Sequence, residues 1–489
     1  MICSKTFIPG SYRKTVMPGS DRASEKQLTQ NNMKKNLLLL ACTFLLAFSC
    51  RQASQGPIKL PVPPREAGQT DMLQFAADPI ENVGIGVVGL GMRGGDAVQR
   101  LTFVPGCHVA AICDVETDRA EKSLAYLTGK GLSANVYSGE EESYKALCED
   151  PSVDLVYICT DWIHHVPVAL YAMEHGKHVA IEVPSAETLQ ACWDLVNTSE
   201  RTRKHCLILE NCCYDFFEMT ALTMAQQGVF GEIIHAEGAY HHNLDPFWKH
   251  YWDNWRLDFN SKHRGDLYPT HGFGPVCQAL NIHRGDRLTT LVAMDTDPFN
   301  GPKHTKAAGM KDKPFANGDV TMTMLRTQKG KTILIEHDVL TPRPYNRMYQ
   351  LVGTDGYAGK YPIQEICLRP EGAQNVNYQN LGYEKVYRGE SLEQLMAQYR
   401  NPILTPELEA LAKEVGGHGG MDFIMDYRMV YCLNNGLPLD MDVYDLAEWC
   451  CVTELSRISL ENGCAPVEVP DFTRGAWDRI QGFSYAFAK

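Results

Sequence analysis

The chain has 489 residues, of which 44% are hydrophobic and 21% are charged, and its formal net charge is −13. A chain of this length and composition folds into two or three globular domains, which excludes a protein that is disordered throughout. The acidic balance, without any run of lysine and arginine, disfavours non-specific binding to nucleic acid, which requires basic patches, so no nucleic-acid partner is expected.

The first 50 residues are typical of a leader followed by a lipoprotein-type signal peptide. A short basic stretch at Met33–Asn36 precedes the apolar run Leu37–Phe48, which is too short to span a bilayer and has the length of a signal-peptide core. The run ends in Ala47-Phe48-Ser49-Cys50, which resembles a bacterial lipoprotein cleavage box, although Ala47 stands where leucine is usual. An ordinary cleaved signal is the alternative.

This segment predicts an exported protein that is lipid-anchored through Cys50 in a bacterial envelope, at the periplasm or the cell surface. The anchor is then its only contact with the membrane, and residues 1–32 lie upstream of the true start at Met33. Residues 51–80 form the linker, which is rich in proline between Pro57 and Pro64. Proline-rich, weakly patterned sequence predicts an extended tether between the anchor and the folded part.

The apolar run Val83–Val88 predicts a strand, and a GxGxxG turn follows it directly, before a helix from about Asp96 to Thr102. The first glycine permits a tight turn, the second lets the backbone approach a pyrophosphate, and the third lets helix and strand pack closely. The helix N-terminus offers free N–H groups to the phosphates. We therefore predict a dinucleotide held by five residues of this turn, namely Gly89, Gly91, Met92, Arg93 and Gly94.

Asp114 ends the next predicted strand, His108–Cys113, and lies 20 residues after Gly94. A carboxylate at this position accepts hydrogen bonds from the ribose hydroxyls of the cofactor and repels a 2′-phosphate, so it favours NAD over NADP. A residue that only caps the turn is the alternative.

Strands and helices alternate through residues 81–205, which predicts an α/β Rossmann domain with a doubly wound parallel sheet. A strand at Val153–Cys159 precedes a helix at about Val166–His175, and the next strand ends at Glu182-Val183-Pro184. Because ligands bind at the carboxyl ends of such strands, the segments that follow them are further candidates for cofactor contacts. These are Trp162, Ile163, His164, His165, Glu182 and Val183.

Residues 206–489 are expected to form an α+β domain with an open, mostly antiparallel sheet. Val320–Arg326 and Lys331–His337 predict a hairpin, and Asp422–Asn434 predicts a helix that returns to the core. Such a sheet often pairs with a second copy through its exposed face, so a homodimer is a further expectation.

Two groups in this second region carry candidate chemistry. Phe247–Trp255 is rich in aromatic residues and is either a core-facing amphipathic helix or partly a wall on which sugars stack. Tyr268 and His271 are spaced i, i+3, so both face the same way in a helix or turn and could relay a proton beside a bound cofactor. A structural histidine at a helix start is the alternative.

The 17 cysteines do not form a framework. Most lie in apolar runs and are expected to be buried thiols. Neither the adjacent Cys212 and Cys213 nor any other cysteine has the spacing of a metal site, so no metal is expected.

The motifs in the first domain resemble those of the glucose–fructose oxidoreductase and inositol dehydrogenase superfamily (Gfo/Idh/MocA). They are Thr160 to His165, Gly176-Lys177-His178-Val179 and the Glu-x-Pro at Glu182. Most members of the superfamily have lysine in the middle of the last motif, where it is thought to deprotonate the substrate. Val183 stands there in this chain, which argues against a simple sugar dehydrogenase.

A branch with Glu-Val-Pro is similar along the whole chain from Val83 onward, namely glycoside hydrolase family 109, the NAD-dependent α-N-acetylgalactosaminidases. The second domain carries its Asn254-Trp255-Arg256, Tyr268-Pro269-Thr270-His271 and His418-Gly419-Gly420-Met421-Asp422 segments. The resemblance implies that His271 and Tyr268 are catalytic and that Asn211 and Tyr268 contact the cofactor. It also implies a set of substrate contacts, which comprises Tyr240, Arg256, Tyr268, Pro269, Thr270, His271 and Tyr345.

The resemblance therefore implies a glycosidase acting on terminal N-acetylgalactosamine-type glycosides of a glycan or glycoconjugate. The reaction would proceed by oxidation, elimination, hydration and reduction with tightly bound NAD that is recycled in each turnover. Two alternatives remain open: an NAD-dependent sugar or polyol dehydrogenase, and a non-catalytic glycan-binding lipoprotein that keeps NAD for stability.

Overall fold

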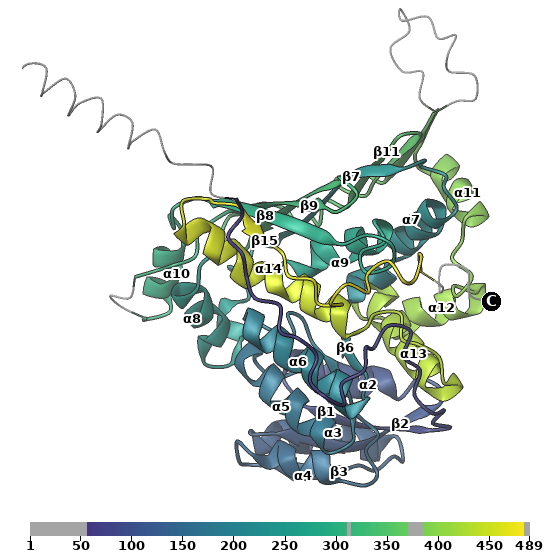
Figure 1. Cartoon of the computed structure of the whole chain (residues 1–489). Helices are drawn as coiled ribbons and strands as arrows, with labels where there is room; N and C mark the ends of the chain where they lie inside the picture. Colours follow the sequence, from purple (N-terminus) through teal and green to yellow (C-terminus); the bar gives the residue numbers. More distant parts are fainter. Residues whose placement is uncertain (1–55, 311–313, 370–384, 484–489) are drawn as a thin grey trace, which may run out of the picture. The chain divides into compact units, whose positions relative to one another are not determined.

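The computed structural model describes residues 56–310, 314–369 and 385–483 (Figure 1). The predicted leader and signal peptide, with Cys50, lie outside these residues. Within the described residues, no helix combines the length and the apolar character that crossing a membrane requires.

The first sheet has six parallel strands in the order β3-β2-β1-β4-β5-β6, which is the Rossmann order and confirms the predicted fold class. Its central strands are buried along their whole length because helices cover both faces. The strands are β1 (Val83–Val88), β2 (Cys107–Asp114), β3 (Asn135–Ser138), β4 (Leu155–Ile158), β5 (His178–Ile181) and β6 (Cys206–Ile208). The helices are α2 (Met92–Leu101), α3 (Thr117–Gly129), α4 (Ser143–Glu149), α5 (Trp162–Glu174) and α6 (Leu189–Thr202).

Two details of this domain differ from the sequence expectation. Strand β6 pairs with β5, so the parallel sheet continues past the predicted boundary at residue 205. Helix α5 begins at Trp162 rather than at Val166, so Trp162–His165 form its first turn.

The second sheet has nine strands in the order β14-β13-β12-β11-β7-β10-β9-β8-β15. Among the described strands all neighbours are antiparallel except β7 and β10, which confirms the mostly antiparallel sheet, and β9 and β10 form the predicted hairpin. The strands are β7 (Ile233–His241), β8 (Leu288–Asp295), β9 (Thr321–Thr327), β10 (Thr332–Asp338), β11 (Gln350–Gly353), β12 (Gly356–Gly359), β13 (Glu365–Leu368), β14 (Lys385–Tyr387) and β15 (Val467–Glu468).

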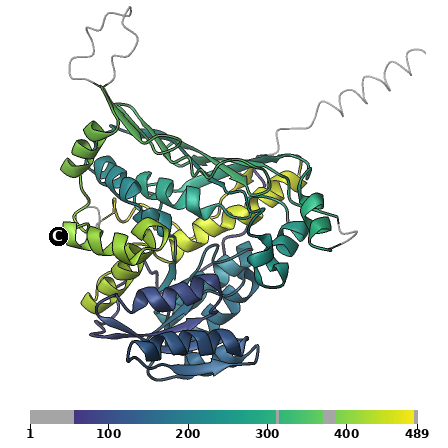
Figure 2. The same cartoon turned by 180° about the vertical axis from the view of Figure 1, so that it is seen from behind.

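Helices α9 and α14 lie between the two sheets, as both views show (Figure 1, Figure 2). Alternate residues of β9 are therefore buried against helices, while Met322 and Met324 are exposed on the opposite face of the sheet. The helices of this part are α7 (Phe216–Gln226), α8 (Trp255–Lys262), α9 (Thr270–Ala279), α10 (Gly301–Ala307), α11 (Glu390–Gln398), α12 (Pro406–Val415), α13 (Met421–Asn435) and α14 (Val443–Glu461). Helix α13 confirms the helix predicted at Asp422–Asn434.

The aromatic segment 247–255 is not the amphipathic helix that the sequence suggested. It forms two short 3-10 turns, Trp248–His250 and Trp252–Asn254. The backbone of Asp253 and Asn254 has positive φ, 48° and 53°, which interrupts the helix before α8 starts. Trp248 is buried in the core, whereas Trp252 is 49% exposed.

Residues 57–80, which the sequence predicted to be part of a tether, instead pack along the folded body. Ile58 pairs with Val467 next to β15, and Met72 and Leu73 are buried. Arg65 forms an ion pair with the buried Glu200 at 3.1 Å. The expectation was wrong because the few apolar residues and Arg65 find distant partners, which the lack of a periodic pattern in this segment conceals.

Glu200 should therefore contribute strongly to stability. Its wholly buried carboxylate binds Arg65, Arg474 at 2.8 Å and the hydroxyl of Tyr444 at 2.6 Å. Glu200→Gln leaves two guanidinium groups without their anion and should lower the free energy of unfolding by about 3–5 kcal/mol in urea titrations. The exposed Glu414→Gln serves as the control, and an equally small effect of both variants would contradict this role for Glu200.

Candidate functional site

A cavity of about 860 Å³ lies at the carboxyl ends of the first sheet's strands. The turn after β1, the residues after β2 and β4, and the segment His250–Trp255 of the second domain line it. Its size and position are those of a ligand site at the switch point of a doubly wound sheet.

The glycine-rich turn leaves room for a ligand on one side only. Gly89 has φ +85°, and a Cβ on Gly94 would lie 1.7 Å from the carbonyl oxygen of Gly89, so packing of the protein itself excludes a side chain there. A Cβ on Gly91, in contrast, would have only Arg119 Nη1 within 4.0 Å and would project beside the cavity. Helix α2 begins at Met92 without a side-chain cap, so its first N–H groups are available to phosphates. These residues fit a dinucleotide.

Asp114 both caps a turn and faces the cavity. Its carboxylate accepts hydrogen bonds from the amide of Leu90 at 2.6 Å and the amide of Glu116 at 2.8 Å. A carboxylate has about four acceptor sites, so it retains capacity for ribose hydroxyls. Arg119, which the sequence analysis did not consider, lies 3.7 Å from Asp114 Oδ1.

A buried ionic network joins the glycine-rich turn to the second domain. Arg93 forms ion pairs with Glu182 at 2.7 Å and with Asp422 of α13 at 2.9 Å. Asp422 also accepts from Asn211 Nδ2 at 2.5 Å, and its second oxygen lies 2.9 Å from His418 Nδ1. Burial alone would raise the pKa of Asp422, but His418 and the two nearby arginines hold that pKa well below its usual range. Asp422 belongs to the His418–Asp422 motif, but we predicted no role for it from the sequence.

The predicted cofactor contacts fall into two groups. Those that line the cavity are Gly89, Gly91, Met92, Arg93, Asp114 and His164. Those that lie outside its lining are Gly94, Trp162, Ile163, His165, Glu182, Val183, Asn211 and Tyr268. Among these, Ile163 is exposed, and both ring nitrogens of the buried His165 face backbone carbonyls, those of Pro184 and Thr160.

Arg256 lies in an aromatic cage next to this cavity. Its guanidinium carbon is 4.8 Å from the ring centre of Tyr268, 5.0 Å from Trp162 and 5.9 Å from Tyr240, and it donates to the hydroxyl of Tyr251 at 2.7 Å. No carboxylate in the described part of the chain forms an ion pair with this buried cation. A buried guanidinium without an anion favours a ligand that brings hydrogen-bond acceptors.

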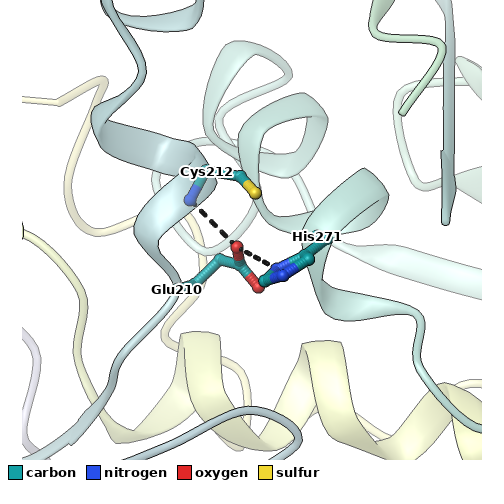
Figure 3. A group of neighbouring side chains, drawn as sticks. All are labelled: Glu210, Cys212 and His271. Atoms are coloured by element: carbon teal, nitrogen blue, oxygen red, sulfur yellow. Dashed lines mark hydrogen bonds and ion pairs between the residues drawn. The ribbon is translucent and has the colours of Figure 1, made fainter. Parts of the chain in front are cut away.

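Tyr268 and His271 face one another, as their spacing predicted. The hydroxyl of Tyr268 lies 3.4 Å from His271 Nε2, and Tyr240 stacks on Tyr268 with ring centres 4.3 Å apart. Pro269 and the buried Thr270 sit at the start of α9 and set this geometry. The other ring nitrogen, His271 Nδ1, contacts Glu210 Oε1 at 2.7 Å (Figure 3).

Sequence reasoning missed Glu210 and His242. Glu210 follows the apolar residues of β6, and a polar residue after a parallel strand is the signal that could have identified it. His242 lies one residue beyond β7, and its Nδ1 is 2.8 Å from the hydroxyl of Tyr240. Its ring is 5.1 Å from that of Tyr345, which is 41% exposed.

Glu210, Cys212 and His271 also have the composition of a metal site, since their ligand atoms lie within 4.8 Å of one another (Figure 3). The donor set argues against one. Burial raises the pKa of Cys212 well above its usual range, although the guanidinium of Arg347, 2.8 Å from the sulfur, opposes this. Metals bind the thiolate, and His271 Nδ1 is already engaged by Glu210.

Two family profiles cover the described domains. Residues 83–209 match "Oxidoreductase family, NAD-binding Rossmann fold", and residues 214–479 match "Glycosyl hydrolase 109, C-terminal domain".

Close relatives carry the same family name. The chain is 58% identical to glycosyl hydrolase family 109 protein 1 of Bacteroides thetaiotaomicron, over 93% of this chain and 98% of that protein. It is 56% identical to a glycosyl hydrolase family 109 protein of Porphyromonas gingivalis, over 92% and 97%.

Solved structures share the fold at low identity. A levoglucosan dehydrogenase in complex with NADH and levoglucosan aligns with TM-score 0.60 and 16% identity, over 80% of this chain and 100% of that one. An oxidoreductase of Agrobacterium radiobacter in complex with NAD⁺, L-tartaric acid and magnesium aligns with TM-score 0.57 and 15% identity, over 79% and 98%. The first domain thus binds NAD. With its Rossmann domain and its characteristic second domain, the chain belongs to glycoside hydrolase family 109.

Proposed function

We propose that this glycoside hydrolase removes terminal, α-linked N-acetylgalactosamine from a glycan or glycoconjugate. The observation that carries the proposal is the Tyr268–His271 pair, which packs beside the NAD cavity through Trp162. The ring of Trp162 is 5.9 Å from that of Tyr268 and 5.1 Å from that of Trp255, which lines the cavity. A proton-handling pair at this place suits a sugar that is oxidised and reduced during its hydrolysis.

Bound NAD would supply a hydride acceptor for C3 of the sugar and the hydride for its later reduction. The chain's own residues handle the protons. Tyr268 and His271 take the proton of the C3 hydroxyl and assist removal of the C2 hydrogen as a proton, which the adjacent ketone makes acidic. Loss of that proton expels the group on C1, which leaves with a proton, and a double bond forms between C1 and C2. Water then adds across this bond, with its hydroxyl at C1 and a proton at C2, so the net reaction is hydrolysis.

The remaining side chains orient the sugar. Arg256, caged and without an ionic partner in the described part of the chain, offers its donors to the hydroxyl and N-acetyl oxygens of the substrate. Tyr240 and Tyr345 shape the walls. Val183 has no ionisable group, which is why the proton transfer falls to Tyr268 and His271.

We further propose that NAD stays bound between turnovers. Two features support retention. His250, Tyr251, Trp252 and Trp255 line the cavity from the second domain, and the ion pair of Arg93 with Asp422 holds the glycine-rich turn to the same domain. A cofactor that is regenerated in every cycle needs no external supply.

The direct test uses purified protein lacking residues 1–50, with p-nitrophenyl α-N-acetylgalactosaminide and a panel of related glycosides. The proposal predicts release of p-nitrophenol without added NAD, and NAD in the denatured protein by mass spectrometry. Reduction of the bound NAD by a free sugar, with no turnover of any glycoside, would establish the dehydrogenase instead.

His271→Ala separates catalysis from glycan binding alone. General acid–base groups contribute about 10²–10⁴-fold, so the turnover number should fall by about that factor while NAD content is unchanged. The exposed His175→Ala is the control. Unchanged turnover in His271→Ala would remove the histidine from the mechanism.

Asp114→Ser should relax the choice of cofactor. The variant removes the charge that repels a 2′-phosphate and leaves Arg119 to attract it. We expect the ratio of NADP to NAD affinity to rise by at least about tenfold, roughly the effect of 1.4 kcal/mol. Titration of nucleotide-free protein would measure it, with the exposed Asp118→Ser as control, and an unchanged preference for NAD would contradict the assignment.

We propose from the sequence that the protein is exported and lipidated on Cys50. The basic stretch, the apolar run and the cleavage box support this. Mass spectrometry of the mature N-terminal peptide from a bacterial host should find diacylglyceryl-modified Cys50. An unmodified N-terminus downstream of an ordinary cleavage site would favour the alternative.

A further inference from the structure

Glu210 and His271 form a buried pair directly behind Tyr268. Glu210 comes from the carboxyl end of β6 in the first domain, and His271 comes from the first turn of α9 in the second. Glu210 is fully buried, its Oε1 lies 2.7 Å from His271 Nδ1, and it also accepts from the amide of Cys212 at 3.1 Å. The two nitrogens of the ring therefore have different partners, a carboxylate and a phenol.

The charge state of Glu210 decides which nitrogen of His271 carries the proton. Burial by itself would raise the pKa of Glu210, but the nearby His271, together with the other hydrogen bonds that the carboxylate accepts, lowers this pKa below its usual range. An ionised carboxylate can only accept hydrogen bonds, so Nδ1 must be the donor. In the neutral ring Nε2 then carries no hydrogen and can accept the proton of the Tyr268 hydroxyl, 3.4 Å away.

We propose that Glu210 is a positioning residue that holds His271 in the tautomer whose Nε2 accepts a proton from Tyr268. This inference rests on the proposed function. When the substrate hydroxyl gives its proton to the Tyr268 oxygen, the phenol proton moves to His271 Nε2. The resulting imidazolium keeps its Nδ1–H on Glu210, whose negative charge stabilises it. The reverse transfer accompanies reduction, so no proton is gained or lost over the cycle.

The chain contains a second buried glutamate–histidine pair, which lies away from Tyr268 and serves as a control. Glu448 Oε2 lies 2.9 Å from His283 Nε2, and both side chains are as buried as Glu210. His283 neither contacts Tyr268 nor lines the NAD cavity. Glu448→Gln therefore reproduces the loss of a buried carboxylate on histidine without touching the site.

The experiment compares Glu210→Gln with Glu448→Gln by two readouts. The first is the tautomer of His271, from ¹⁵N-histidine NMR of the protein with its bound cofactor, with His271→Ala to assign the signals. We expect the Nδ1–H form in the parent and its loss in Glu210→Gln. The second is steady-state turnover of the nitrophenyl glycoside. We expect kcat to fall by about 10²–10⁴-fold with KM within about threefold in Glu210→Gln, and both to be unchanged in Glu448→Gln.

Two further variants test whether Glu210 acts through its charge and through His271. Glu210→Asp retains the charge, so it should keep the Nδ1–H form of His271 with intermediate kcat. This variant tests the inference if Glu210→Gln fails to fold. Glu210→Gln added to His271→Ala should cause no further loss, because the carboxylate acts only through the imidazole.

Three results would overturn the inference. An Nε2–H tautomer in the parent protein is the first. The second is equal kcat for Glu210→Gln and Glu448→Gln. The third is a stoichiometric metal ion, removed with activity by a chelator, which would make Glu210, Cys212 and His271 a metal site. The NMR readout does not depend on turnover, so a parent without glycosidase activity would refute the proposed function and still test the tautomer.

Discussion

The ion pair between Arg93 and Asp422 is the interaction on which the site depends. Arg93 belongs to the glycine-rich turn and Asp422 to α13, 329 residues further along the chain. Both groups are largely removed from solvent, and breaking such a pair leaves an uncompensated buried charge at a cost of about 3–5 kcal/mol. Glu182 and Asn211 are held by the same two side chains, so the ends of β5 and β6 are fixed to the second domain at one point.

Because the two domains are joined at this point, side chains from both can form the part of the site where we propose that the substrate binds. The aromatic cage of Arg256 combines Trp162 from the first domain with Tyr240, Tyr251 and Tyr268 from the second. The Glu210–His271 pair likewise spans both domains. Tyr268 and His271 thus keep their position relative to the glycine-rich turn as long as the domains stay joined.

The sequence could predict those elements that are specified by residue patterns within short windows of the chain. The GxGxxG turn, the parallel strands, the hairpin and α13 depend on spacing within short windows, and the structure confirms each of them. Tyr268 and His271 face each other because they are only three residues apart. Asp422 and Glu210 acquire their roles from partners 329 and 61 residues away, which no local pattern reports.

The wrong expectations have the same origin. Residues 57–80 lack a periodic pattern, yet isolated side chains such as Met72 and Arg65 meet distant partners and fasten the segment to the body. In the segment 247–255, aromatic spacing favoured a helix, and Asp253 and Asn254 interrupt it with positive φ although neither is a glycine.

We propose above all that hydrolysis proceeds through oxidation at C3 and loss of the C2 hydrogen. The most direct measurement is turnover in D₂O followed by NMR of the released sugar. We expect deuterium at C2 of the product, because the hydrogen removed there exchanges with solvent before a proton is returned. A product that keeps hydrogen at C2, from a substrate whose C2 deuteration does not slow turnover, would contradict it and indicate a direct displacement at C1.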